Sequence, residues 1–251
     1  MSEVATLISV LEFQREHHVD GNVYKACQCD FAYNSNHIEG STLTSEQTVQ
    51  IFDCNVFSGT ATIDDIVETR NHFNAFGHIL DSYDKPIDAE YLCQLHGILK
   101  AGTSDAADPI MSVGRFKRAS NVIGGEISSV ETASPDDVPK LVEDLLKRYS
   151  PNRSHTFEEI VRFHWEFERI HPFSDGNGRV GRLVMFKECL ASDVVPFIIT
   201  EDIRQFYLRG LREYTREPGY LNETCGFAQD QFRASYLPLA IEFERAMNEL
   251  R

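Results

Sequence analysis

The sequence predicts an all-α fold with one small β-hairpin. Apolar residues recur at helical spacing along most of the chain, for example over 63–83. Two capping boxes, Thr44–Gln47 and Thr156–Glu159, mark helix starts. One short stretch, Arg115–Gly125, has an extended pattern that ends in two glycines. These observations favour a bundle of helices that carries a single hairpin.

The expected helices follow from apolar spacing and from helix start and stop residues. In the first half of the chain they are Val4–His17, Val23–Glu39 closed by Gly40, the helix opened by the Thr44 capping box, Ile63–Tyr83 and Asp88–Lys100. In the second half they are a helix that starts at Ser134–Asp137, then Thr156–Ile170, Gly178–Leu190, Asp202–Arg216 and Phe227–Leu250. A loop is expected over Thr103–Gly114, and Pro218-Gly219 separates the last two helices.

Composition limits the class of protein. With 251 residues and 42% hydrophobic residues, the chain can bury a core in one domain, or in one domain with a helical extension. A formal charge of −15 argues against a broad nucleic-acid interface. The six cysteines show no paired C-x-x-C spacing, and neither a secretory leader nor a long apolar run is present. We therefore expect a cytoplasmic protein with reduced thiols and without a membrane span.

The run from His171 to Arg182, HPFSDGNGRVGR, combines a base, a carboxylate, glycines and two arginines between two predicted helices. His171 has the only side chain of the run with an ordinary pKa near neutrality, so it is the candidate general base. Asp175 offers a hard oxygen ligand, which suits Mg²⁺ carried by a nucleotide. Phe173 is expected to be buried and to hold the loop in place.

The same run predicts a phosphate site, because a glycine-flanked loop that opens a helix leaves backbone N–H groups free for an anion. Gly176 and Gly178 let the backbone approach a phosphate, and Asn177 tolerates unusual dihedral angles. Arg179 and Arg182 share a face of the first turn and bring forked donors for phosphate oxygens. Arginines there oppose the helix dipole, and a bound anion would offset that cost.

This run matches the motif H-P-F-x-D-G-N-G-R-x-x-R at every fixed position, and the chain resembles the Fic family on these residues. The family transfers the AMP part of ATP to a hydroxyl side chain of a protein. The resemblance implies that His171 deprotonates the hydroxyl and that Arg182 reaches the terminal phosphate. The Doc branch, which transfers phosphate, carries alanine and lysine in the stretch that is Gly176–Arg179 here. The implied phosphate-binding set is Asp175 (with Mg²⁺), Gly176, Asn177, Gly178, Arg179, Val180, Gly181 and Arg182.

A second resemblance lies upstream, where Ser35-Asn36-His37-Ile38-Glu39-Gly40 matches the inhibitory pattern S/T-x-x-x-E-G/N of the family. Ser35 and Glu39 are four residues apart and therefore project from one helical face. Gly40 suits the residue that ends a helix. The resemblance implies that Glu39 pairs with Arg182 and blocks the productive pose of the γ-phosphate.

Two further elements are expected from the resemblance. The stretch Arg115–Gly125 resembles the family's flap, a hairpin that lies over the site and holds the target by strand pairing. Val122 and Ile123 would form the apolar clamp, and Val122–Gly125, including Gly124 and Gly125, would line the nucleotide. The adenine would lie near Tyr207 and Tyr214, seven residues apart on one helical face, although both positions also suit core tyrosines.

A zinc site is not expected. His164 and His171 share a helical face, but no H-E-x-x-H spacing accompanies them, and Asp175 has another expected role.

The resemblance extends from about Phe31 to about Tyr214 and implies the Fic fold, a helical bundle whose central helix pair flanks the motif loop. We expect a helical extension over 1–85 that carries the inhibitory helix. A Fic catalytic core follows over 86–217, and a C-terminal helical segment over 218–251.

Three functions remain open. The first is a protein adenylyltransferase held inactive by Glu39, and the second is removal of AMP with Glu39 positioning a water. The third is a nucleotide-binding scaffold without turnover. The implied co-substrate is ATP with Mg²⁺, although the motif residues bind phosphates and select the nucleobase only weakly. The acceptor would be a hydroxyl of an unknown protein or of the chain itself. A homodimer is a family option, and neither nucleic acid nor a membrane is an expected partner.

Overall fold

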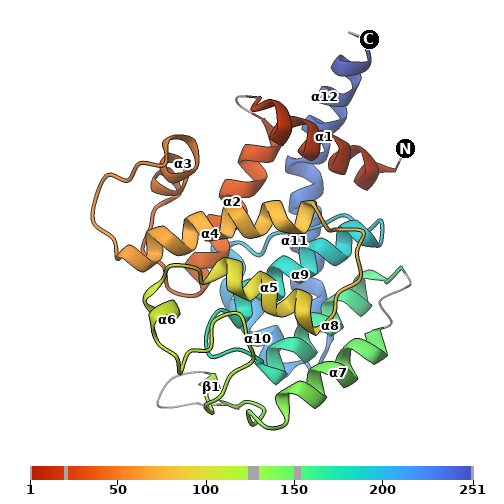
Figure 1. Cartoon of the computed structure of the whole chain (residues 1–251). Helices are drawn as coiled ribbons and strands as arrows, with labels where there is room; N and C mark the ends of the chain where they lie inside the picture. Colours follow the sequence, from red (N-terminus) through yellow and green to blue (C-terminus); the bar gives the residue numbers. More distant parts are fainter. Residues whose placement is uncertain (1, 20–21, 124–129, 150–153, 250–251) are drawn as a thin grey trace.

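The computed structural model describes residues 2–19, 22–123, 130–149 and 154–249. The first part of the chain forms α1 (Glu3–His17), α2 (Val23–Ile38), α3 (Ser45–Cys54), α4 (Ile63–Leu80), α5 (Ala89–Leu99) and the one-turn α6 (Ser104–Ala107). The remainder forms β1 (Val122–Ile123), β2 (Val130–Glu131), α7 (Val138–Tyr149), α8 (Phe157–Ile170), α9 (Asn177–Ala191), the 3₁₀ turn η1 (Glu201–Ile203), α10 (Arg204–Glu213), α11 (Gly219–Ser235) and α12 (Leu237–Glu249). The helices pack around α9, and the two ends of the chain lie side by side through α1 and α12 (Figure 1).

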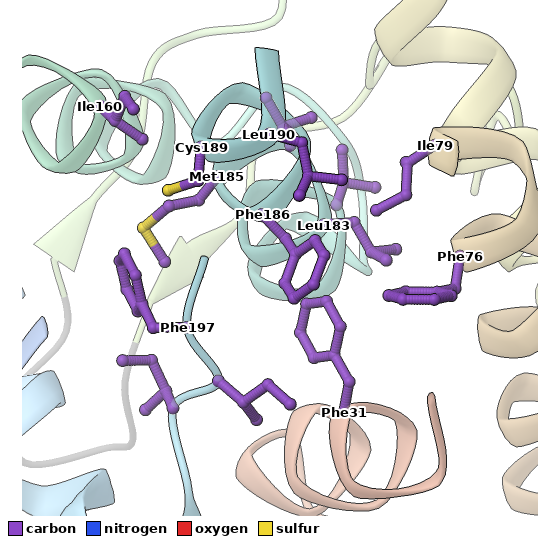
Figure 2. Packing of buried hydrophobic residues seen from close by; sticks show 14 of the residues in the cluster. Phe31, Phe76, Ile79, Ile160, Leu183, Met185, Phe186, Cys189, Leu190 and Phe197 are labelled. Carbon is purple, nitrogen blue, oxygen red and sulfur yellow. The ribbon is translucent and has the colours of Figure 1, made fainter. Parts of the chain in front are cut away.

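The central position of α9 follows from its sequence, since apolar residues occur on every face and nearly the whole helix is buried. Phe186 of α9 stacks on Phe31 of α2, with ring centroids 5.3 Å apart, and contacts Phe76 of α4 edge-on at 5.3 Å. Figure 2 shows these three rings converging from their helices. This packing brings the amino-terminal helices α2 and α4 against the helix that carries the two motif arginines.

The all-α prediction is confirmed, and the small hairpin is present as β1 and β2. They pair antiparallel, with Val122 opposite Glu131 and Ile123 opposite Val130. The predicted flap residues Gly124 and Gly125 lie outside the described residues. Within the described ranges, no helix is both long and apolar enough to cross a membrane.

The helices depart most from the prediction in the C-terminal segment and in the loop before the hairpin. The single helix predicted over Phe227–Leu250 is wrong, because α11 starts at Gly219 and ends at Ser235, and α12 follows it. Pro238 explains the break, since its ring lacks an N–H and clashes with the carbonyl four residues earlier. The loop predicted over Thr103–Gly114 contains the single turn α6.

Candidate active site

The loop between α8 and α9 is held by its own side chains. α8 ends at His171, whose left-handed backbone (φ 51°) leads the chain out of the helix. Asn177 accepts a hydrogen bond from the Phe173 N–H (2.8 Å) and donates one to the Phe173 carbonyl (2.9 Å). Phe173 is fully buried and stacks on His96 of α5, with centroids 4.1 Å apart, as predicted for a residue that holds the loop. Gly176 then turns the chain into α9 with φ 77°.

His171 is half-buried beside two amide groups. Its Nδ1 lies 3.1 Å from the Asn121 Nδ2 and 3.1 Å from the Asn177 Nδ2. Burial, and next the Lys117 ammonium, lower the pKa of His171 to about 4. The ring is therefore neutral at pH 7 and is able to exchange a proton with a bound group.

The hairpin is joined to this loop at its base. The Lys117 N–H donates to the Pro172 carbonyl (2.9 Å), and Asn121 Nδ2 donates to the Phe173 (3.0 Å) and Ser174 (3.2 Å) carbonyls. The residues next to β1 are thereby bonded to the residues that follow His171.

Arg182 is bound by the end of α2. Its Nη2 donates to Glu39 Oε1 (2.7 Å) and to the Ser35 carbonyl (2.8 Å), and its Nε donates to Ser35 Oγ (3.0 Å). Gly40 follows with φ 101° and ends the helix, so Ser35 and Glu39 reach the arginine from one helical face. The arginine side chain is 2% exposed, whereas that of Glu39 is 35% exposed.

Glu39 lies over the first turn of α9. A Cβ on Gly178 would stand only 2.1 Å from Glu39 Oε1, so the carboxylate occupies space that only a glycine leaves open. A helix amino terminus attracts anions through its free N–H groups and its dipole. The Glu39 carboxylate therefore takes a position that suits an anionic ligand.

A second carboxyl group lies behind Arg182. Glu168 of α8 is half-buried, with its Oε1 shielded from solvent, and this burial raises its pKa to about 8 against the opposing effect of Arg182. A Cβ on Gly181 would lie 2.7 Å from Glu168 Oε1 and 2.9 Å from the His164 ring, so this glycine permits the close approach of α8 and α9. Gly181 thus has a packing role, and Glu168 is uncharged at pH 7.

Arg179 belongs to a different ion network. It donates to Glu68 of α4 and, at 2.9 Å, to Asp175. The Lys100 ammonium pairs with the same Glu68, with Asp105 (2.6 Å) and with Asp175 (2.6 Å). Burial raises the pKa of Asp175, but the Arg179 and Lys100 charges outweigh burial and lower this pKa to about 2. Asp175 is thus ionised at all ordinary pH values.

Asp175 fits the expected Mg²⁺ ligand in part. Its side chain is 48% exposed, and the ion pairs above use Oδ2, which leaves Oδ1 for a cation brought by a nucleotide. Ligand oxygens of Glu68, Asp105 and Asp175 lie within 4.8 Å of one another. The Lys100 ammonium pairs with all three carboxylates and Arg179 with two of them, so a metal held by these three residues alone is disfavoured.

The two tyrosines predicted for the adenine lie in the core. Tyr207 is 1% exposed, and its hydroxyl lies 2.7 Å from His164 Nε2. Tyr214 stacks on Trp165, with centroids 4.6 Å apart. Neither ring presents a free face, so an adenine site at these residues stays a prediction without support from the structure.

The structure thus brings the motif run and the residues Ser35 and Glu39 together from opposite halves of the chain. Sequence reasoning missed the partners that lie outside both motifs: Glu68, His96, Lys100, Lys117, Asn121, Thr132 and Glu168. Asn121 lies inside the stretch that predicted the flap, but that prediction rested on the apolar Val122 and Ile123. The helical partners are single polar residues in ordinary amphipathic helices, and no spacing marks them.

Comparison with known proteins agrees with this geometry. A model of the Fic/DOC family matches residues 86–189. The Protein adenylyltransferase Fic of Drosophila melanogaster is 29% identical over 185 residues, which cover 72% of this chain and 36% of that protein. The proteins of the same name from Drosophila sechellia and Drosophila simulans match equally. The chain spans about a third of the length of these relatives.

Solved structures show the same fold. A Fic domain containing signaling protein from Bacteroides thetaiotaomicron VPI-5482 superposes with a TM-score of 0.71 at 22% identity, covering 96% of this chain and 93% of that one. A Fic family protein from Desulfovibrio desulfuricans G20 gives 0.68 at 25% identity, with 94% and 74% covered. Residues 86–189 therefore match the Fic/DOC family, and the chain as a whole has the helical fold of these solved Fic structures.

Proposed function

We propose that this protein is a protein adenylyltransferase that Glu39 holds inactive. The observation that carries the proposal is the Glu39 carboxylate on Arg182, over the amino terminus of the helix that the motif builds for phosphates. The relatives named as protein adenylyltransferases support the reaction class. ATP is the proposed co-substrate, and the acceptor is a Ser, Thr or Tyr hydroxyl of a target protein or of this chain.

In the proposed transfer, the acceptor oxygen forms a bond to the α-phosphorus of ATP. The bond from that phosphorus to the bridging oxygen of the β-phosphate breaks, and pyrophosphate leaves. The hydroxyl proton passes to His171, whose depressed pKa keeps the ring neutral and free to accept it. Gly176, Gly178 and the backbone N–H groups of the first turn of α9 bind the phosphates.

Asp175 would hold Mg²⁺ through Oδ1 while its Oδ2 stays on Arg179. The ion, when bound, neutralises charge on the phosphates and on the leaving pyrophosphate. The charge of Asp175 is secured by its low pKa, so this role is available throughout the neutral range.

Inhibition follows from competition for Arg182. A γ-phosphate and the Glu39 carboxylate are both anions, and they cannot share one guanidinium group at hydrogen-bond distance without strong repulsion. Glu39 is partly exposed and lies at the end of its helix, so its removal from the arginine requires little unfolding.

The direct experiment incubates the wild-type protein, Glu39→Gly and Glu39→Gly/His171→Ala with ATP labelled at the α-phosphate. We expect strong labelling of the chain or of an added lysate protein with Glu39→Gly, and a loss of about 10²–10⁴-fold when His171 is also replaced. Equal labelling of wild type and Glu39→Gly would contradict inhibition. ATP binding without transfer in every variant would indicate a non-catalytic scaffold. Parallel reactions with GTP, CTP and UTP would test the choice of base.

Removal of AMP is a second candidate, and the contacts of His171 favour it. Both neighbours of its Nδ1 are amide N–H donors, so the ring proton belongs on Nε2, where it can donate a hydrogen bond to the protein oxygen that leaves. In this reaction a water positioned by Glu39 gives a proton to the Glu39 carboxylate and attacks the phosphorus. The bond to the protein oxygen breaks, that oxygen takes up a proton from solvent, and AMP is released. Timed release of AMP from a labelled target, with wild type and with Glu39→Gly, tests it, and faster release without Glu39 would contradict it.

A further inference from the structure

The amide of Asn121 has only one orientation that satisfies its neighbours. Its Oδ1 faces two donors, the Lys117 ammonium at 2.6 Å and the Thr132 hydroxyl at 2.7 Å. Its Nδ2 faces two backbone carbonyls, those of Phe173 (3.0 Å) and Ser174 (3.2 Å). A rotated amide would place oxygen against both carbonyls and nitrogen against the ammonium. The NH₂ group is therefore the end that lies against His171.

The second amide beside His171 is equally constrained. Asn177 Oδ1 accepts from the Phe173 N–H, and its Nδ2 donates to the Phe173 carbonyl. The His171 Nδ1 thus meets N–H donors from both Asn121 and Asn177, and neither of them offers it an acceptor. A neutral imidazole carries one proton, so Nδ1 accepts and Nε2 holds the hydrogen.

We propose that Asn121, oriented by Lys117 and Thr132, is a positioning residue that holds the proton of neutral His171 on Nε2. Lys117 is 3% exposed, and its positive charge also disfavours protonation of the neutral His171 ring to the imidazolium form. The tautomer of His171 therefore depends on residues at the base of the hairpin, since Asn121 immediately precedes β1 and Thr132 immediately follows β2.

The consequence for catalysis rests on the proposed function. Release of AMP builds negative charge on the departing hydroxyl oxygen, and the Nε2–H of the resting tautomer can donate a hydrogen bond to that oxygen. Transfer of AMP needs a lone pair on Nε2 to accept the hydroxyl proton, so the ring proton must first move to Nδ1 and the Asn121 contact must break. Asn121 therefore favours removal of AMP over its transfer.

The tautomer is tested without any turnover. The full chain is labelled with ¹⁵N-histidine, and long-range ¹⁵N–¹H correlations are recorded at pH 7, with His171→Ala identifying the ring. We expect an unprotonated Nδ1 and a protonated Nε2. Asn121→Asp places a carboxylate acceptor beside Nδ1 and should reverse the pattern, whereas Asn74→Asp, the same change on an exposed face of α4, should leave it unchanged. A protonated Nδ1 in the wild type would overturn the proposal.

Thr132→Val provides a milder variant if Asn121→Asp does not fold. It removes one of the two donors that orient the amide, and we expect partial protonation of Nδ1. An unchanged spectrum in both Asn121→Asp and Thr132→Val would also overturn the proposal.

Measurements of AMP transfer then distinguish failure of the Asn121 proposal from failure of the proposed function. In a Glu39→Gly background, Asn121→Asp should raise the rate of AMP transfer about 10-fold. This factor corresponds to the free energy of one net hydrogen bond, the contact that no longer has to break. A reversed tautomer with no transfer by any variant would leave the positioning role intact and reject the adenylyltransferase. Transfer by Glu39→Gly with no effect of Asn121→Asp would support the enzyme and reject the role of Asn121.

Discussion

The two motif arginines lie three residues apart on one helix, yet they are bound in different ways. Arg182 faces one charged carboxylate, Glu39, together with the backbone and hydroxyl of Ser35. Arg179 belongs to a network in which Arg179 and Lys100 are shared by three carboxylates, those of Glu68, Asp105 and Asp175. One arginine therefore pairs with a single partly exposed acid, and the other belongs to a network of several ion pairs.

The difference indicates where regulation can act. Among the described residues, Glu39 is the one acid at ion-pair distance from Arg182, so loss of this contact leaves the arginine with its hydrogen bonds to Ser35 and without an ion pair. Loss of any one acid around Arg179 leaves two others near the same cations. Both networks take an acid from the amino-terminal helices, Glu39 from the end of α2 and Glu68 from α4, so these helices supply ion-pair partners to both arginines of α9.

The largest expected contrast is in stability. Arg179→Ala leaves Glu68, Asp105 and Asp175 with Lys100 alone, and breaking such a buried network typically costs about 3–5 kcal/mol. Arg182→Ala leaves one carboxylate, Glu39, which is partly exposed and can be hydrated, and two Ser35 oxygens without their donor, so we expect a smaller cost of about 1–3 kcal/mol. Urea denaturation of both variants at pH 7 measures the difference. An equal or larger cost for Arg182→Ala would mean that the two sites are not distinguished as described.

The free energy of unfolding, measured over a range of pH, tests the surroundings of Arg182. Burial raises the pKa of Glu168 to about 8, so the folded state binds a proton that the unfolded state releases above its ordinary pKa near 4.5. Stability from this group is therefore lost as the pH rises from about 5 to 8, by up to about 1.4 kcal/mol per pH unit. Glu168→Gln should remove this slope and gain stability relative to wild type as pH rises. Parallel stability curves for the two proteins would show that Glu168 is ionised in the folded state.

The smallest expected effect concerns the glycine beside Arg182. Gly181→Ala would force a Cβ to within 2.7 Å of Glu168 Oε1, and overpacking of this kind costs about 1–3 kcal/mol. Gly226→Ala is a matched control in α11, because a Cβ there meets no atom within 4 Å, and it should stabilise the protein by about 0.5–1 kcal/mol. Melting temperatures of both variants test the pair, and a neutral Gly181→Ala would mean that α8 and α9 have room to separate.

Most of the fold was predictable because its helices carry local signals. The capping boxes at Thr44 and Thr156 start α3 and α8 where the sequence placed them, and the Gly40 stop ends α2. The division of Gly219–Glu249 into two helices was missed because apolar periodicity continues across the break, and the single Pro238 outweighs it.

The site was predictable only where its residues are neighbours in sequence. His171, Asp175 and the two arginines fall in one run, and Ser35 and Glu39 are one helical turn apart. Lys100, Glu68 and Asn121 reach the site through tertiary packing, from helices or loops that show no unusual pattern on their own. The environment of His171 was hidden for the same reason, since the amide orientation of Asn121 depends on Lys117 and Thr132 across the base of the hairpin.

The central claim is that Glu39 competes with the terminal phosphate for Arg182, and the ratio of ATP to ADP affinity measures this most directly. Calorimetric titrations with Mg²⁺ would compare wild type, Glu39→Gln and Glu68→Gln. We expect ATP and ADP to bind wild type about equally and ATP to bind Glu39→Gln about 10-fold more tightly than ADP, because the freed arginine gains a charge-assisted hydrogen bond. Glu68→Gln should keep the wild-type ratio. An unchanged ratio in Glu39→Gln, or a larger change in Glu68→Gln, would contradict the claim.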